Sequence, residues 1–290
     1  MLDLLSQQIV NGVVIGAVYA LMALGMMIIL GVLGVVNAAQ GELYMAGAYI
    51  AFSAVAMLGI DYFSAIVVGM LGSAAVGIVV ERLSVRPILS RPSSILLSTL
   101  GISMMLKNLA LLIWGPEPRE LANPFPEDPI MIGPVILTYQ KVFILVLVLA
   151  VDGGFALFLQ RSRLGLALRA LSRDRDAAVL MGINTQRLYM MTFALGSALA
   201  GAAGVLLGAT YSVYPTMGEL PLMKGFAVVT LAGQGNVLAV VVAALFIGVA
   251  EGIAAGLVST TWMDLVAFST LVAVLLVQPQ GLAKWMARRV

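Results

Sequence analysis

Eight long apolar runs divide this sequence, and they constrain the fold more than any other feature. Each run approaches or exceeds the ~20 residues that a helix needs to cross the hydrocarbon core of a bilayer. The runs lie at approximately Ile9–Leu33, Leu43–Ile60, Phe63–Glu81, Ser94–Trp114, Tyr139–Leu159, Leu188–Thr210, Val237–Val258 and Met263–Val277. They lack the period-two alternation of barrel strands, so helices are predicted. We expect an all-α, polytopic integral membrane protein with eight long transmembrane helices plus one or two short broken or re-entrant segments, in a single transmembrane domain over 1–290.

The composition supports a membrane protein and excludes several kinds of chemistry. Only 10% of the residues are charged and 61% are hydrophobic, whereas about a quarter of the residues of a soluble domain are charged. The sequence has no cysteine and no histidine, which excludes disulfides, thiolate nucleophiles and imidazole bases, and no metal site is predicted. The first residues, MLDLLSQQ, lack the positive region of a cleaved signal peptide, so the first apolar run is expected to stay in the mature protein.

Clusters of basic residues predict which loops face the cytoplasm, because Lys and Arg accumulate in loops that stay inside. The main cluster is the polar island Gln160–Arg187, and further basic residues lie between the third and fourth runs and near the C-terminus. These residues are Arg161, Arg163, Arg169, Arg173, Arg175 and Arg187; Arg82, Arg86 and Arg91; and Lys284, Arg288 and Arg289. The loop at about 115–138 is then outside. Three long runs follow the polar island, which would leave the C-terminus outside. A C-terminus on the inside therefore needs one additional crossing, which the short apolar stretch Gly225–Gly235 could supply as a half-helix or broken helix. With the basic residues serving topology, no nucleic-acid partner is predicted.

The polar island is itself predicted to contain two short helices. Leu164, Leu168 and Leu171 fall at helical spacing, which gives the first helix an apolar stripe. Asp174 can cap a second helix, Arg175–Met181, and Gly182 can end it. In that helix Ala177, Ala178 and Met181 form a small apolar face among charges. One interpretation is docking into a groove of a soluble partner, and the other is an ordinary basic loop that binds nothing.

Polar residues also interrupt the apolar runs. The polar break Asn37–Glu42 follows the first run, and such backbone is tolerated at membrane depth only where protein or a watery cavity satisfies it. It is either a broken helix that lines a transport path or a tight cytoplasmic turn. Its Gln40-Gly41-Glu42 resembles Gln234-Gly235-Asn236, which indicates a weak internal repeat. Lys107 lies within the fourth run, where a charged residue is a functional candidate, and the favoured alternative is a structural pair with Asp152 or Glu251.

Two runs carry small residues four positions apart, which lets helix backbones approach closely in a membrane. We expect both helices to pack inside the bundle or against another subunit. The residues are Gly196, Ala200, Gly204 and Gly208 in the sixth run and Ala244, Gly248, Gly252 and Gly256 in the seventh.

Several blocks of the sequence together resemble the LivH-type permease, a membrane subunit of bacterial ABC importers for branched-chain amino acids. The blocks occur in order from near one end to the other: VVNAAQGELYMAGAYIA, RSRLGLALRALSRDRDAAVLMGIN, TFALGSALAGAAGVLLG, YPTMGELPLMKGFAVVTLAGQGN and VQPQGL. The resemblance implies a multi-pass protein of the bacterial inner membrane, surrounded by lipid. It also implies a LivM-type second permease, two cytoplasmic ATPase subunits and a periplasmic solute-binding protein. The same family includes permeases for urea, short amides and other small solutes.

The resemblance further implies alternating access driven by the ATPases. The loop at about 160–187 would couple to them through Leu164, Leu168, Leu171, Asp174, Ala177, Ala178, Met181 and Gly182. The candidate residues of the substrate pathway are Asn37, Gln40, Glu42, Ser98, Thr99, Ser103 and Gln234. No cofactor is expected in this chain, which lacks a G-x-x-x-x-G-K-[ST] phosphate loop, so ATP and Mg²⁺ would bind the partner subunits. A passive channel would need a self-sufficient ring of like residues, and an intramembrane enzyme a nucleophile with its base.

Overall fold

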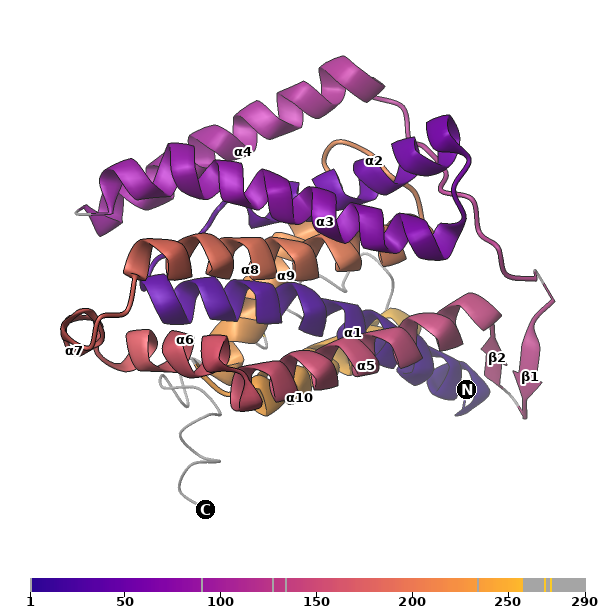
Figure 1. Ribbon diagram of the computed structural model, residues 1–290. Coiled ribbons are helices and arrows are strands. Elements are labelled where there is room, and N and C mark those ends of the chain that lie inside the picture. Colours follow the sequence, from indigo (N-terminus) through magenta and orange to yellow (C-terminus); the bar gives the residue numbers. More distant parts are fainter. Residues whose placement is uncertain are drawn as a thin grey trace, which may run out of the picture. The chain divides into compact units, whose positions relative to one another are not determined.

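The computed structural model describes residues 2–89, 91–126, 128–133, 135–233 and 235–257 together with Ser269 and Val272. The described part is almost entirely helical, with a single small hairpin of strands (Figure 1). Its elements are α1 (Leu2–Leu33), α2 (Gln40–Leu58), α3 (Tyr62–Val80), a π-helical turn (Glu81–Val85), a 3-10 turn (Arg86–Ile88), α4 (Pro92–Trp114), β1 (Ile130–Ile132), β2 (Val135–Leu137), α5 (Tyr139–Arg161), α6 (Arg163–Arg173), α7 (Arg175–Leu180), α8 (Thr185–Gly208), α9 (Glu219–Ala232) and α10 (Val237–Leu257).

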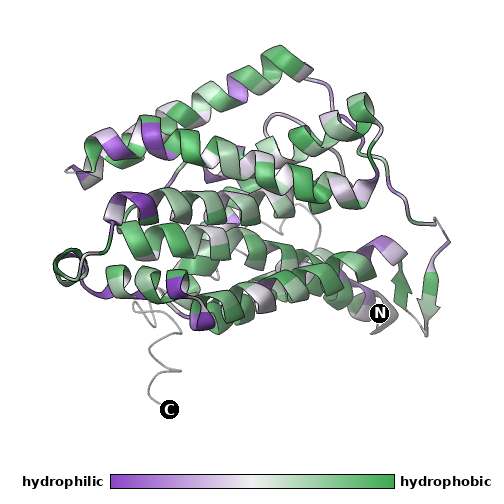
Figure 2. Cartoon of the chain, viewed as in Figure 1, coloured by the Kyte–Doolittle hydropathy of each residue, from purple (hydrophilic) through white to green (hydrophobic). Residues whose placement is uncertain are grey.

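Seven helices in the described residues are long and apolar enough to cross a membrane: α1 to α5, α8 and α10. This confirms the polytopic all-α class, whereas the expected eighth span, Met263–Val277, lies outside the described residues apart from Ser269 and Val272. The additional short segment expected at Gly225–Gly235 is the 14-residue helix α9, which begins earlier, at Glu219. Figure 2 shows mostly hydrophobic colour along the middle of the helices, with hydrophilic colour gathered at helix ends and in connecting segments.

The chain forms two compact units rather than one continuous body. Unit 1 comprises 1–24, 123–152 and 223–290, and unit 2 comprises 25–122 and 153–222. Each unit is assembled from segments far apart in the sequence. The boundaries between the units fall within α1, α5 and α9, so each of these helices contributes residues to both.

In unit 2, α2, α3 and α8 pack against one another, each contacting the other two (Figure 1). Helix α3 runs antiparallel to α8: the Ser73 hydroxyl donates to the Ser197 carbonyl at 2.8 Å, and further along Arg82 Nη2 contacts Met190 Sδ at 3.7 Å. Helix α2 runs in the same direction as α8, since Gln40 contacts Gly196 and, two turns further along, Ala48 lies beside Gly208. Small residues make this close packing feasible, since a Cβ added at Gly47 would lie 2.9 Å from the Gly201 carbonyl carbon.

The small residues of α8 predicted from the sequence lie in these contacts. Gly196 faces α1 at Gly25, Gly204 faces the backbone of Tyr44 on α2, and Gly208 faces the side chain of Val213. Ala200 is fully buried. In lipid, contacts of this kind are a main source of attraction between helices.

Unit 1 uses the same device between α1 and α10. Gly12 and Gly16 of α1 face Gly248 of α10, and a Cβ at Gly12 would lie 2.9 Å from the Cα of Val249. Gly252 approaches Gln8, whereas Gly256 is only partly buried. The four-residue spacing of Gly12 and Gly16 is a signal that the sequence analysis missed, although it matches the spacing on α10.

The membrane orientation that follows from the arginine clusters can be tested with single cysteines, because the chain has none. Ser172→Cys on α6 and Ala287→Cys, which lies outside the described residues, are expected to react with an impermeant thiol reagent only from the cytoplasmic side. Asn123→Cys is expected to react only from outside, since Lys- and Arg-rich loops stay inside. The measurement is reagent labelling in intact cells compared with inverted vesicles.

Labelling of Ala287→Cys from outside would contradict an additional crossing in the C-terminal part. Labelling of Ser172→Cys from outside would reverse the whole orientation. The unmodified chain, which has no thiol, provides the background.

Candidate functional site

The polar break between α1 and α2 is a turn whose backbone is satisfied by its own side chains. Helix α1 ends at Leu33, and Gly34 turns the chain with a φ of +68°. The Asn37 side chain accepts a hydrogen bond from the Ala39 amide at 3.1 Å and donates one to Gln40 Oε1 at 3.1 Å. All three residues are buried. The break therefore meets the condition for irregular backbone at membrane depth, which is that protein groups satisfy it.

Two contacts place this break beside the middle of α8 and against α4. Gln40 Nε2 donates to the Gly196 carbonyl at 3.0 Å, and Gly196 stands at the middle of the 24-residue helix α8. The Ala38 amide donates to Thr99 Oγ1 on α4 at 3.2 Å. The break therefore lies level with the middle of α8, a helix long enough to span the hydrocarbon core.

Helix α4 presents polar side chains one turn apart toward this region. Ser98 contacts Ser84 at 2.9 Å between hydroxyl oxygens, and Thr99 meets the break. One turn further, Ser103 interacts with the carboxyl group of Glu42 on α2. After another turn Lys107 forms an ion pair with Glu219, the first residue of α9. Of the predicted pathway residues, Asn37, Gln40, Glu42, Thr99 and Ser103 come together here.

The structure corrects the expected partner of Lys107. Its partner is Glu219, not Asp152 or Glu251. Glu251 instead accepts a hydrogen bond from Lys224 at 3.0 Å and one from the Tyr19 hydroxyl at 3.1 Å, inside unit 1. Lys224 and Glu251 are both buried. Asp152 is buried too, and among the described residues neither of its carboxyl oxygens has a hydrogen-bond partner.

A glycine contact brings the start of α9 against the start of α2. A Cβ added at Gly41 would lie 2.6 Å from the carbonyl oxygen of Gly218, and one at Gly218 would overlap the Gly41 carbonyl. The expected match to Gln40-Gly41-Glu42 was Gln234-Gly235-Asn236, of which Gln234 lies outside the described residues. The pairing found is between Gly41-Glu42-Leu43 and Gly218-Glu219-Leu220. This repeated Gly-Glu-Leu was the signal available in the sequence, and it opens a helix in both places.

The polar island folds as two short capped helices. The Ser162 side chain accepts from the Gly165 amide at 2.8 Å and begins α6, while Asp174 accepts from the amides of Asp176 and Ala177 at 3.0 Å and begins α7. Within α6, the side chains of Leu168 and Leu171 are buried and that of Leu164 is partly buried. Gly182, with a φ of +79°, follows α7.

The exposed apolar face of α7 matches the expected one only in part, because Ala177 and Met181 are exposed and Ala178 is not. Ala178 was expected to face a partner, but its side chain is only 4% exposed. The side chains that point away are Leu180, 87% exposed, and Met181, 82% exposed, with Val179 beside them. Helix α7 spans only six residues, so one side of it must face inward, and Ala178 is the residue buried there.

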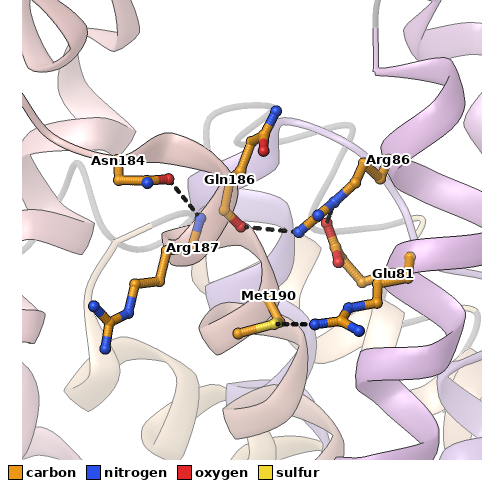
Figure 3. Close-up of polar contacts among 7 residues, drawn as sticks. Glu81, Arg86, Asn184, Gln186, Arg187 and Met190 are labelled. Atoms are coloured by element: carbon orange, nitrogen blue, oxygen red, sulfur yellow. Dashed lines mark hydrogen bonds and ion pairs between the residues drawn. The ribbon is translucent and has the colours of Figure 1, made fainter.

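The two basic clusters of unit 2 meet at the end of the unit where α8 begins. Figure 3 shows Arg86 between Glu81, whose carboxylate its Nε contacts at 3.2 Å, and the Gln186 carbonyl, which its Nη2 contacts at 3.5 Å. Beside them Asn184 caps α8 by accepting from the Arg187 amide at 3.0 Å. Helices α6 and α7 immediately precede this point. Only residues 181–184 separate α7 from α8.

Comparison with known proteins gives a near-full-length match. A family model described as the permease component of the branched-chain amino acid transport system matches residues 8–275. The chain is 36% identical over 290 residues to the high-affinity branched-chain amino acid transport system permease protein BraD of Pseudomonas aeruginosa, with 95% of this chain and 94% of that protein covered. It is 37% identical over 291 residues to the corresponding protein LivH of Salmonella typhimurium, with the same coverage. A solved inward-facing structure of a metal-chelate type ABC transporter matches with a TM-score of 0.50 and 15% identity over 92% of this chain and 85% of that one, which shows the fold alone.

Proposed function

The chain belongs to the family of branched-chain amino acid transport permease components, and from this membership we propose that it moves branched-chain amino acids through the membrane as part of an ATP-driven importer. The observation that carries this proposal is the match over nearly the whole chain to permeases named for that transport. A permease component of this kind is the translocation subunit, a multi-pass membrane protein. Hydrolysis of ATP with Mg²⁺ belongs to the partner ATPases.

We propose four partners for the working assembly: a second permease of the LivM type, two cytoplasmic ATPase subunits and a periplasmic solute-binding protein. The ATPases would bind α6 and α7. Leu180 and Met181 support this, because they form an exposed apolar tip next to the arginine clusters that mark the cytoplasmic side. A tip of this kind suits a groove on a soluble partner.

The route that we propose for the solute runs past the polar break and the polar side chains of α4. Asn37, Gln40, Glu42, Thr99 and Ser103 supply hydrogen-bonding groups at mid-bilayer, where the acyl chains of lipid offer a polar solute none. The structure of unit 2 also offers a mechanical connection. Helix α8 starts directly after α7, and at its middle Gly196 accepts the hydrogen bond from Gln40. A tilt of α8 caused by the ATPases would therefore move the break, as alternating access requires.

The test of this function is reconstitution of the full assembly in vesicles with its binding protein. We expect leucine, isoleucine or valine to stimulate ATP hydrolysis and to accumulate in the vesicles. The apolar side chains around the route suit an aliphatic tail, and the route offers no ring of like charges that would select an inorganic ion. The chain without its ATPases is expected to transport nothing.

Urea is the informative competitor in the same assay. Stimulation by urea alone would preserve the family assignment and overturn the proposed solute. Flux of any solute through the purified chain without ATPases would instead indicate a channel.

A further inference from the structure

Three charged side chains of unit 2, Glu42, Lys107 and Glu219, gather with the Ser103 hydroxyl near the middle of the membrane, and we call these four residues the charge cluster. Ser103 stands at the middle of the 23-residue helix α4, and Lys107 follows one turn later. The Lys107 side chain is 31% exposed and that of Glu219 is 52% exposed. Charges at this depth are costly in lipid and mark pathways and ligand sites. The exposed side of the charge cluster must therefore face water or another subunit rather than acyl chains.

Glu42 is the buried member of the charge cluster. It is 6% exposed, and its Oε2 atom has no hydrogen-bond partner among the residues that the structure describes. Its neighbours are the Ser103 hydroxyl and the charges of Lys107 and Glu219. The residue lies in the first turn of α2, where the positive end of the helix dipole favours a carboxylate. A buried carboxylate oxygen without a partner is unfavourable until a donor reaches it, and an ammonium group is the donor that suits it best.

The glycine contact fixes the position of Glu219. Because Gly41 and Gly218 touch through their backbones, the start of α9 is held against the start of α2. Glu219 thereby meets Lys107, which extends from α4. The Lys107–Glu219 ion pair thus lies beside a carboxylate that has one oxygen unused.

We propose that the charge cluster recognises the two charged groups of an α-amino acid, with Glu42 binding the ammonium group and Lys107 binding the carboxylate in exchange for Glu219. This proposal rests on the proposed function, and it names the chemical groups of the solute that the residues along the route bind. The exchange replaces one ion pair of Lys107 with another. It releases Glu219, which is more than half exposed and can be solvated where it stands.

This arrangement separates amino acids from the other small solutes of the family. Urea or a short amide carries no charge, so it cannot displace Glu219 from Lys107 and gains no ion pair with Glu42. A fatty acid lacks the ammonium group, and an aliphatic amine lacks the carboxylate. A zwitterion alone satisfies both ends of the charge cluster.

The experiment measures equilibrium binding of radiolabelled leucine to the purified assembly of permeases and ATPases, without binding protein, in the wild type and three variants. Glu42→Gln and Lys107→Gln each remove a charge-assisted contact, and we expect the Kd for leucine to rise roughly 10- to 100-fold. Glu219→Gln removes the competitor for Lys107, so the Kd is expected to fall. Asn108→Ala is the matched control, because Asn108 neighbours Lys107 and its side chain donates only to the Met104 carbonyl, at 2.7 Å, among the hydrogen bonds described. It should leave the Kd unchanged.

The opposite signs of the two α4–α9 variants distinguish recognition from a structural ion pair. If Lys107–Glu219 only held the helices together, Lys107→Gln and Glu219→Gln would shift the Kd in the same direction, and the proposal would be wrong. Competition on the wild type provides a second arm that needs no variant to fold. We expect 4-methylpentanoate, which lacks the ammonium group, and isopentylamine, which lacks the carboxylate, to compete far more weakly than unlabelled leucine.

Equal competition by either analogue would overturn the proposal and leave the proposed function intact. Wild-type assembly that binds no branched-chain amino acid and is stimulated by none would overturn the proposed function itself. The two failures are therefore separate results of the same set of measurements.

Discussion

Gly204→Leu is expected to remove nearly all of the protein from the membrane fraction. A Cβ at this position would lie 2.8 Å from the carbonyl carbon of Tyr44 and overlap its oxygen. The obstacle is backbone on α2, so no side-chain rotation can relieve it. Overpacking by single methylene groups already destabilises proteins by about 1–3 kcal/mol, and leucine adds four carbons. Helices α2 and α8 would have to separate, which removes packing that in lipid has no hydrophobic substitute.

The measurement is the amount of tagged chain in the membrane fraction and its elution as one species from a sizing column in detergent. Gly101→Leu is the matched control. Gly101 lies on α4, and a Cβ there meets no atom within 4 Å in the described part of the chain. The control should accumulate as the wild type does. Normal accumulation of Gly204→Leu would show that α2 and α8 are not packed as in this structure.

The sequence predicts the helices much better than it predicts their neighbours. The end of α4 at Trp114 and the start of α10 at Val237 coincide with the ends of apolar runs, because glycine and polar residues flank them. The spacing of Gly196, Ala200 and Gly204 indicates one close-packing face on α8. It does not say that this face meets Gly25 on α1 and Tyr44 on α2. Periodicity describes one helix at a time, and the partner depends on how distant segments assemble.

The candidate site shows the same limit. Glu42 and Ser103 could be identified from the sequence as candidate site residues. A polar residue within an apolar membrane segment is costly, so it indicates a functional or structural role. Glu219 was not identified, since it lies in a stretch of mixed character 112 residues from Lys107. Its relation to Glu42 depends on the contact between Gly41 and Gly218. In the sequence this contact is visible only as a repeated Gly-Glu-Leu, and a repeat of three residues is easily overlooked.

Burial on a very short helix was also beyond the sequence. Helix α7 spans six residues, so its hydrophobic pattern is too brief to fix which face points inward. Ala177, Ala178 and Met181 were predicted from the sequence to form the docking face, and Leu180 was not considered. In the structure Ala177 and Met181 are exposed as expected, whereas Ala178 is buried and Leu180 is exposed.

Leu180→Asp is expected to abolish transport while leaving membrane insertion intact. If Leu180 enters a groove on an ATPase, its burial contributes about 1.5–3 kcal/mol, and aspartate loses this and adds the desolvation of a carboxylate. The combined loss weakens docking roughly 10- to 100-fold or more. The ATPases should then fail to co-purify, or should hydrolyse ATP without responding to leucine. Since Leu180 is 87% exposed in this chain, the fold itself should be unaffected.

Two other substitutions show whether the loss arises from docking. Met57→Asp changes a similarly exposed apolar side chain near the C-terminal end of α2 and should leave the ATPases attached. Ala178→Arg forces a long charged side chain into a buried position, so it should lower accumulation of the chain rather than act on docking alone. The order of effects then identifies the interface: ATPases lost with normal accumulation for Leu180→Asp, normal behaviour for Met57→Asp and reduced protein for Ala178→Arg. Full transport by Leu180→Asp with its ATPases bound would rule out α7 as the contact, because no groove that holds a leucine tolerates a charge in its place.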